Sequence, residues 1–141
     1  SVATVTDPNL APFGTGIRAG ARVVMLSSAR YPTLDATQPA VFSRPIVADL
    51  LQVRLGFRGV VMTDDIGAVI ALRAVPLAQR AIKFINAGGH LVLSVRTADA
   101  APLSNALMAQ VAKDPLFRHR IDVAAMRVVQ SKIDAGLASC G

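Results

Sequence analysis

Three short apolar runs separated by helical patterns constrain the fold of this chain most strongly. The runs are "RVVMLS" (22–27), "GVVMTDD" (59–65) and "HLVLSV" (90–95), and they lie about 35 residues apart. Strand, helix and strand at this spacing are the signature of right-handed βαβ units, which build parallel sheets. We therefore predict an α/β fold with about three parallel strands and flanking helices. The continuous apolar character of the first run is typical of a strand covered on both faces.

The segments around these strands carry apolar residues at spacings of three and four, which predict helices. The clearest case is 77–87, "LAQRAIKFINA", where Ala81, Phe84 and Ile85 share one face and Gly88 follows as a stop signal. Further helices are expected over 9–19, 43–55, 101–112 and 115–135, with a weak helical turn over 66–72. Residues 27–42 show no periodicity and predict a long loop. A length of 141 residues fits one domain, residues 1–141.

Charge and cysteine content exclude several classes of protein. Lys and Arg number 15 against nine Asp and Glu, a net charge of +6, yet the basic residues are scattered singly and aromatic residues do not alternate with them. No nucleic-acid interface is expected. No apolar stretch is long enough for a membrane span, and the N-terminus shows no signal peptide. Cys140 is the single cysteine, so neither a disulfide nor a cysteine metal site is predicted.

Two adjacent carboxylates, Asp64 and Asp65, end the second apolar run. Functional groups of parallel α/β proteins gather at the carboxyl ends of strands, which favours a functional position. The alternative is that Asp65 caps the next helix and Asp64 is a solvated loop residue. Neighbouring side chains of a strand point to opposite sides, so the two are not expected to form the facing acid and nucleophile pair of a glycosidase. No His or third acid stands at a matching strand end, so no metal is predicted.

The remaining polar candidates are weaker. Ser27 and Ser28 follow the first strand and are placed to bond a ligand hydroxyl, but no G-x-S-x-G elbow surrounds them. His90 precedes the third strand, at the end of the sheet opposite the expected site, and is interpreted as structural or solvent-facing. His119 falls on the solvated face of a late helix. No phosphate-binding glycine motif is present, so no nucleotide cofactor is expected, and a flavodoxin-like binding domain lacks an anion site.

The stretch 30–68, "RYPTLDATQPAVFSRPIVADLLQVRLGFRGVVMTDDIGA", resembles glycoside hydrolase family 3, in its bacterial β-N-acetylhexosaminidase branch. That branch carries a "YP-x-LD" loop, a "PA-x-x-S-x-x-I-V-x-x-LL" helix, an "LGF-x-G" turn and a "TDD" strand end in the same order. The resemblance extends to about 9–136. It implies the last part of a (β/α)₈ barrel and hydrolysis of β-N-acetylglucosaminides derived from peptidoglycan. The compartment is left open between the bacterial cytoplasm and the cell envelope.

The resemblance also implies roles for individual residues. Asp64 corresponds to the nucleophile that forms the covalent glycosyl-enzyme of a retaining mechanism. Asp65 is expected to orient loops or substrate, and Ser28 and Tyr31 are expected substrate contacts. No cofactor is implied, and the expected ligand is a carbohydrate.

The departures from the family shape the expectation for activity. A "KHFPGHG"-like segment and a His/Asp acid-base pair are not found in the sequence, and Ser28 stands where many relatives have His. General-acid help contributes roughly 10²- to 10⁴-fold in rate, so the chain alone is expected to be inactive or nearly so. The alternative is a non-catalytic relic or a binding or assembly module. Three parallel strands also leave two unpaired edges, which predicts a compact open α/β sandwich, a homo-oligomer or poor solubility.

Overall fold

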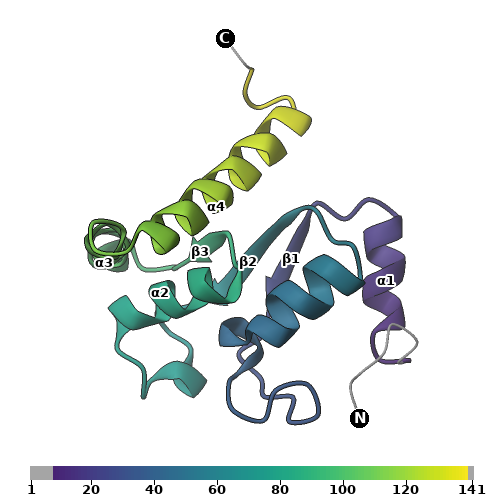
Figure 1. Cartoon of the computed structure of the whole chain (residues 1–141), viewed down its shortest axis with the longest axis horizontal. Helices are drawn as coiled ribbons and strands as arrows, with labels where there is room; N and C mark the ends of the chain where they lie inside the picture. Colours follow the sequence, from purple (N-terminus) through teal and green to yellow (C-terminus); the bar gives the residue numbers. More distant parts are fainter. Residues whose placement is uncertain (1–7, 140–141) are drawn as a thin grey trace.

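The computed structural model describes residues 8–139, so Cys140 lies outside the described residues. These form a three-stranded parallel sheet of order β1-β2-β3 with flanking helices (Figure 1). The strands are β1 (Val23–Leu26), β2 (Val60–Asp65) and β3 (Leu91–Leu93). The α/β fold and the parallel order are therefore confirmed, with each strand a little shorter than its apolar run.

The helices fall close to the predicted ranges. They are α1 (Ala11–Arg18), η2 (Pro45–Arg54), α2 (Leu77–Ala87), α3 (Ala100–Val111) and α4 (Pro115–Asp134). Short 3₁₀ turns occupy η1 (Ala40–Phe42), η3 (Ile70–Leu72) and η4 (Thr97–Asp99). The helix η2 has π-type hydrogen bonding, which its end illustrates: the Leu55 N–H donates to the Leu50 carbonyl five residues back. None of the described helices is long and apolar enough to cross a membrane.

The core lies between one face of the sheet and the layer of η2 and α2. On α2, Ala81, Phe84 and Ile85 are buried as predicted, and Gly88 ends the helix at φ 102°, a left-handed conformation that favours glycine. The largest fully buried apolar side chains come from several elements: Phe57, Phe84, Phe117, Ile66, Val47 and Val61. The helices η2, α2, α3 and α4 therefore contribute buried apolar residues to one shared core, whereas α1 has no buried residue.

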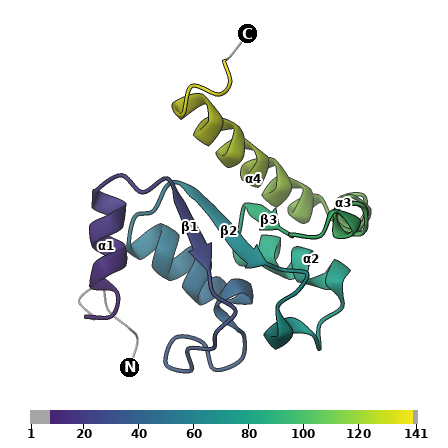
Figure 2. The ribbon, with the colours of Figure 1, turned by 180° about the vertical axis from the view of Figure 1, so that it is seen from behind.

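The opposite face of the sheet is open along β1. Seen from behind, β1 and β2 have no helix in front of them (Figure 2), and the side chains of Val23 and Met25 are 47% and 52% exposed. Alternate residues of β1 point to the helix layer, where Leu26 is buried. The expectation that the first strand is covered on both faces was wrong, because a continuous apolar run marks what a strand can bury and not what lies against it.

The ends of the sheet differ in what surrounds them. The strand arrows lead to the loops that follow β1 and β2, whereas the C-terminal half of α4 extends away from the sheet on the other side (Figures 1 and 2). The loops at the carboxyl ends of the strands are where the sequence predicts a site.

Asp114 caps α4, since its Oδ1 accepts hydrogen bonds from the N–H groups of Leu116 (2.9 Å) and Phe117 (3.1 Å).

Candidate active site

Asp64 and Asp65 lie in the last two positions of β2, beside an irregularity in the sheet. Met62 pairs with Leu91 and Asp65 pairs with Leu93, so β2 contains one residue more than β3 between these two pairs. This extra residue is a β-bulge, a feature that re-aims side chains near the ends of strands. The hydroxyl of buried Thr63 fills the gap in the ladder, because its Oγ1 accepts a hydrogen bond from the Leu93 N–H (2.9 Å).

The two carboxylates have different surroundings, as predicted from their adjacency. Asp64 is exposed, and its Oδ1 accepts a hydrogen bond from the Asp65 N–H (2.7 Å). Asp65 is half-buried, and its Oδ1 accepts from the N–H groups of Gly67 (3.2 Å) and Val95 (3.3 Å). Asp65 thus joins the turn after β2 to the segment after β3. The alternative that Asp65 caps a helix does not hold, because a turn and not a helix follows it directly.

Ser28 and Asp64 line the same small hollow at the carboxyl ends of β1 and β2. Thr63 also lines it, and its apolar walls come from Leu26, Val41, Ile66, Val69 and Leu72. The hollow has a volume of about 10 Å³, which is room for about one water molecule. A sugar ring therefore has to approach Asp64 from outside the hollow, on the exposed side of the carboxylate.

Tyr31 lies elsewhere, in the loop between β1 and η1. It lines a cavity of about 550 Å³ between α1, β1 and η2, with mostly apolar walls, and Asp64 does not take part in it. Asp35 shapes the same loop, because its Oδ1 accepts from the Thr37 hydroxyl (2.7 Å) and from the Thr37 N–H (2.8 Å). The hydrogen bond from the Thr37 hydroxyl, followed by one from the Ser43 hydroxyl, holds the pKa of Asp35 well below its usual range.

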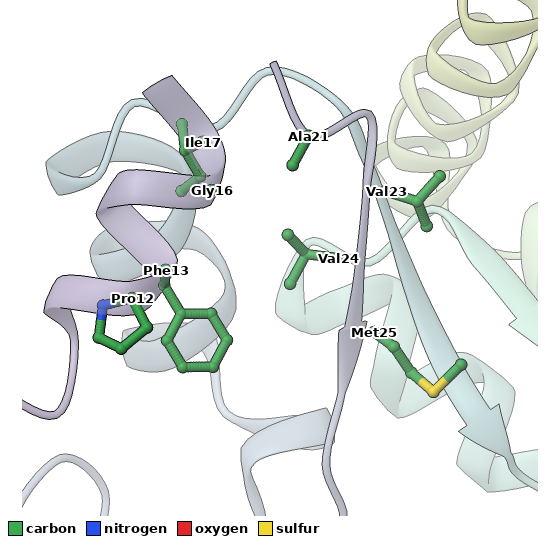
Figure 3. Close-up of a pocket in the computed structure, with 8 residues that line it drawn as sticks. All are labelled: Pro12, Phe13, Gly16, Ile17, Ala21, Val23, Val24 and Met25. Atoms are coloured by element: carbon green, nitrogen blue, oxygen red, sulfur yellow. The ribbon is translucent and has the colours of Figure 1, made fainter. Parts of the chain in front are cut away.

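A second apolar cleft, of about 320 Å³, separates α1 from the outer strand β1 (Figure 3). Phe13 and Ile17 extend from α1 on one side, and Val24 points toward them from β1, whereas Val23 and Met25 point away from α1. The outer edge of β1 is unpaired in the described sheet. The Arg22 carbonyl accepts a hydrogen bond from the Val60 N–H (2.9 Å), so the backbone of Arg22 faces β2. Because the backbone groups of successive residues alternate between the two edges of a strand, the backbone groups of Val23 and Met25 face the unpaired edge.

Arg80 is a site residue that the sequence analysis missed. Its side chain is buried, with 8% of the residue exposed, and it reaches from α2 to the segment that follows the aspartates. Nη1 donates to the carbonyls of Ile66 (2.7 Å) and Gly67 (3.1 Å), and Nε donates to the Val75 carbonyl (2.8 Å). The signal was present, because residue 80 shares the inward helical face with Ala81 and Phe84 and a cation there needs partners.

Asp99 supports the same segment from the side of β3. Its carboxylate accepts hydrogen bonds from the Ser94 hydroxyl (2.8 Å) and from Arg96, whose Nη2 lies 3.0 Å from Oδ1. The Ser94 bond, followed by those from Arg96, holds the pKa of Asp99 below its usual range although burial opposes this. Gly67 packs against this carboxylate so closely that a Cβ added there would meet Asp99 Oδ2.

Neither histidine lies at this end of the sheet. His90 lies at the start of β3. Its ring Nδ1 accepts a hydrogen bond from the Val61 N–H (3.0 Å), and its backbone N–H donates to the Val61 carbonyl (2.9 Å). His119 is exposed on α4. The structural interpretation of His90 and the solvated position of His119 are both confirmed. Among the described residues, no group of three or more His, Cys, Asp or Glu side chains could hold a metal ion.

A parallel α/β unit with carboxylates at the carboxyl end of a strand is an arrangement that enzymes of the (β/α) barrel and open parallel-sheet classes share. Residues 2–131 match the glycosyl hydrolase family 3 N terminal domain, so the chain belongs to this family. Curated relatives named β-hexosaminidase, from Xanthomonas oryzae pv. oryzae and Stenotrophomonas maltophilia, are each 41% identical over 85 residues. That alignment covers 60% of this chain and 25% of each relative.

Solved structures give the same result for nearly the whole chain. A β-N-acetylhexosaminidase from Beutenbergia cavernae is 43% identical, with a TM-score of 0.87 over 94% of this chain and 39% of its own. A family 3 β-N-acetylglucosaminidase from Paenibacillus is 27% identical, with a TM-score of 0.84 over 94% of this chain and 26% of its own. The chain thus spans between a quarter and two fifths of the length of these relatives.

Proposed function

We propose that this chain carries the nucleophile of a retaining β-N-acetylhexosaminidase, and that Asp64 is that nucleophile. The observation that carries the proposal is the position of Asp64, exposed at the carboxyl end of β2 in a family 3 domain. Relatives at 41% and 43% identity bear the names β-hexosaminidase and β-N-acetylhexosaminidase, which supports an N-acetylglucosaminide as the substrate class. Peptidoglycan fragments would supply such glycosides.

The chemistry requires a carboxylate that is free to attack. An Asp64 oxygen would bond to the anomeric carbon while the bond to the leaving-group oxygen breaks, giving a glycosyl ester that water later hydrolyses. Asp65 would keep the turn beside the nucleophile in place through Gly67 and Val95, and Ser28, which shares the hollow with Asp64, would offer a hydroxyl to the sugar. Tyr31 would contact a saccharide only outside the hollow of Asp64, because it lines a separate cavity.

The described residues place no histidine beside Asp64, so the leaving group would receive no proton from a histidine there. General-acid assistance contributes roughly 10²- to 10⁴-fold. We therefore expect very slow turnover of natural saccharides by the chain alone. Glycosides whose leaving group departs without a proton should still transfer their sugar to Asp64.

The test uses a dinitrophenyl β-N-acetylglucosaminide with the purified chain. We expect a burst of dinitrophenolate and an intact mass increased by one N-acetylglucosaminyl group, located on Asp64 by peptide mapping. The Asp64→Asn variant should give neither signal, while Asp49→Asn, which changes an exposed aspartate on η2, should behave like the parent. Equal background rates in the parent and in Asp64→Asn would reject the nucleophile.

A second candidate function is a binding or assembly module without catalysis. The small size of the hollow beside Asp64 and the open edge of β1 favour it. In this case two copies would associate through the exposed strand that carries Val23 and Met25, and chitooligosaccharides would bind without being cleaved. Light scattering would then show a dimer that Met25→Lys dissociates, and calorimetry would show binding that is unchanged in Asp64→Asn.

A further inference from the structure

The segment from Ile66 to Val75, which follows the two aspartates, is closed at both ends by a single side chain of α2. We propose that Arg80 is a positioning residue for Asp64: its guanidinium clamps this segment and thereby fixes the end of β2 from which Asp64 projects. The inference rests on the proposed role of Asp64 as nucleophile and adds a residue that does not itself contact the sugar.

The geometry of the clamp follows from the three donor bonds of Arg80. Nη1 reaches the carbonyls of Ile66 and Gly67 at the start of the segment, at 2.7 and 3.1 Å, and Nε reaches the carbonyl of Val75 at its end, at 2.8 Å. A rigid planar fork can hold both ends at once. A lysine offers one ammonium on a flexible stem and cannot reproduce this arrangement.

The burial of Arg80 makes these bonds strong. The residue is 8% exposed, and a charge taken out of water is tolerated only where hydrogen bonds replace its hydration. No buried side-chain nitrogen or oxygen in the described residues is left without a partner. The positive charge of Arg80 is also among the causes that keep the pKa of Asp99 low. Arg80 therefore interacts electrostatically with the carboxylate against which Gly67 packs.

The clamped segment reaches Asp64 through the backbone and through packing. The Ile66 N–H donates to the Leu93 carbonyl (3.0 Å), and the Gly67 N–H donates to Asp65 Oδ1 (3.2 Å). Ile66, together with Val69 and Leu72 of the same segment, forms walls of the hollow that Asp64 lines. Release of the clamp should therefore loosen the wall beside the nucleophile while the strands keep their pairing.

The experiment compares the parent chain with Arg80→Met, Arg80→Lys and the matched control Arg73→Met, which changes an exposed arginine beyond η3. Amide hydrogen exchange measures the clamp, and formation of the glycosyl-enzyme from the dinitrophenyl glycoside measures its effect. For Arg80→Met we expect Ile66 and Gly67 to exchange at least about tenfold faster, with Val61 little changed. The saturating glycosylation rate should fall on the order of 10- to 100-fold with an unchanged half-saturating concentration.

Rescue separates positioning from general damage. Millimolar guanidinium should restore part of the rate in Arg80→Met and none in the control, and Arg80→Lys should be intermediate. If Arg80→Met does not fold, Gly67→Ala provides the second route, because its Cβ would meet Asp99 and displace the same segment without a change at Arg80. This variant should show the same faster exchange at Ile66 and the same slower glycosylation.

The outcomes for Arg80→Met test the clamp and its effect on Asp64 separately. Unchanged exchange at Ile66 and Gly67 in Arg80→Met would overturn the clamp, and faster exchange with an unchanged glycosylation rate would overturn the positioning of Asp64. If the parent forms no glycosyl-enzyme, the proposed function fails separately. The carboxyl ¹³C signal of Asp64 then serves as the readout: a shift or broadening in Arg80→Met but not in Arg73→Met supports the inference, and an unmoved signal rejects it.

Discussion

Acidification should destabilise this protein through His90. The ring accepts the Val61 N–H at Nδ1, 3.0 Å away, so the imidazole is bound in its neutral form and joins the starts of β2 and β3. Burial, and next the positive charge of Arg127, lowers the pKa of His90 from 6.5 to about 4. A proton on Nδ1 would remove the acceptor and place a second donor against the Val61 N–H.

The direction of this pH dependence follows from the protonation of His90 in the folded and unfolded states. Below pH 6.5 the unfolded chain binds a proton at His90, whereas the folded chain stays neutral until about pH 4. The contribution to stability is therefore fully present above pH 6.5 and is lost as the pH falls toward 4. At about 1.4 kcal/mol per pH unit the interval corresponds to about 3 kcal/mol. The ring is only partly buried, which reduces our expectation to about 2 kcal/mol.

Urea unfolding followed by circular dichroism between pH 7.5 and 4 measures this loss. His90→Asn offers an oxygen acceptor near the position of Nδ1 that does not titrate, so its free energy of unfolding should fall less over the same range. His119→Gln changes an exposed histidine and should follow the parent curve. The reasoning would be refuted by parallel curves for His90→Asn and the parent.

Two further predictions concern hydrogen bonds that complete the fold. Thr63→Val should destabilise by about 1–3 kcal/mol, because it leaves the Leu93 N–H without its acceptor beside the bulge; Thr63→Ser should retain most of the stability in the same urea titration, and an equal loss in both would contradict the role of the hydroxyl. Asp114→Ala should cost about 0.5–2 kcal/mol by removing the cap of α4. Asp114→Asn should be nearly neutral in thermal unfolding, whereas a loss as large as that of the alanine variant would argue against capping.

The two aspartates show how much of the site could be read from the sequence. An apolar run that ends in "TDD" predicts carboxylates at the end of a parallel strand, and that position is observed for Asp64 and Asp65. The division between them needed the structure, because the register shift between Met62 and Asp65 and the bond from Val95 involve β3 and the segment after it, some 30 residues away in the chain.

Tyr31 and Arg80 mark the limits of prediction in opposite directions. Tyr31 is adjacent to the predicted site in sequence, but the loop fixed by Asp35 carries it to a different cavity. Arg80 lies far along the chain on a helix, yet its guanidinium bonds the segment directly after the aspartates. For Arg80, sequence distance is a poor guide because its long side chain bonds a segment that precedes its helix. For Tyr31, the bonds from Thr37 to Asp35 are local, but the cavity that the loop reaches depends on how the loop packs against α1 and η2.

The sequence by itself determined the order of helices and strands, the parallel sheet and the family. Apolar periodicity and glycine stops are local properties of the chain, so they place elements such as α2 without knowledge of their neighbours. Only the tertiary structure decided which face of β1 is open, how His90 joins two strands, and how Arg80 closes the segment beside Asp64. These features arise from contacts between residues distant in sequence, whose geometry exists only once the chain has folded.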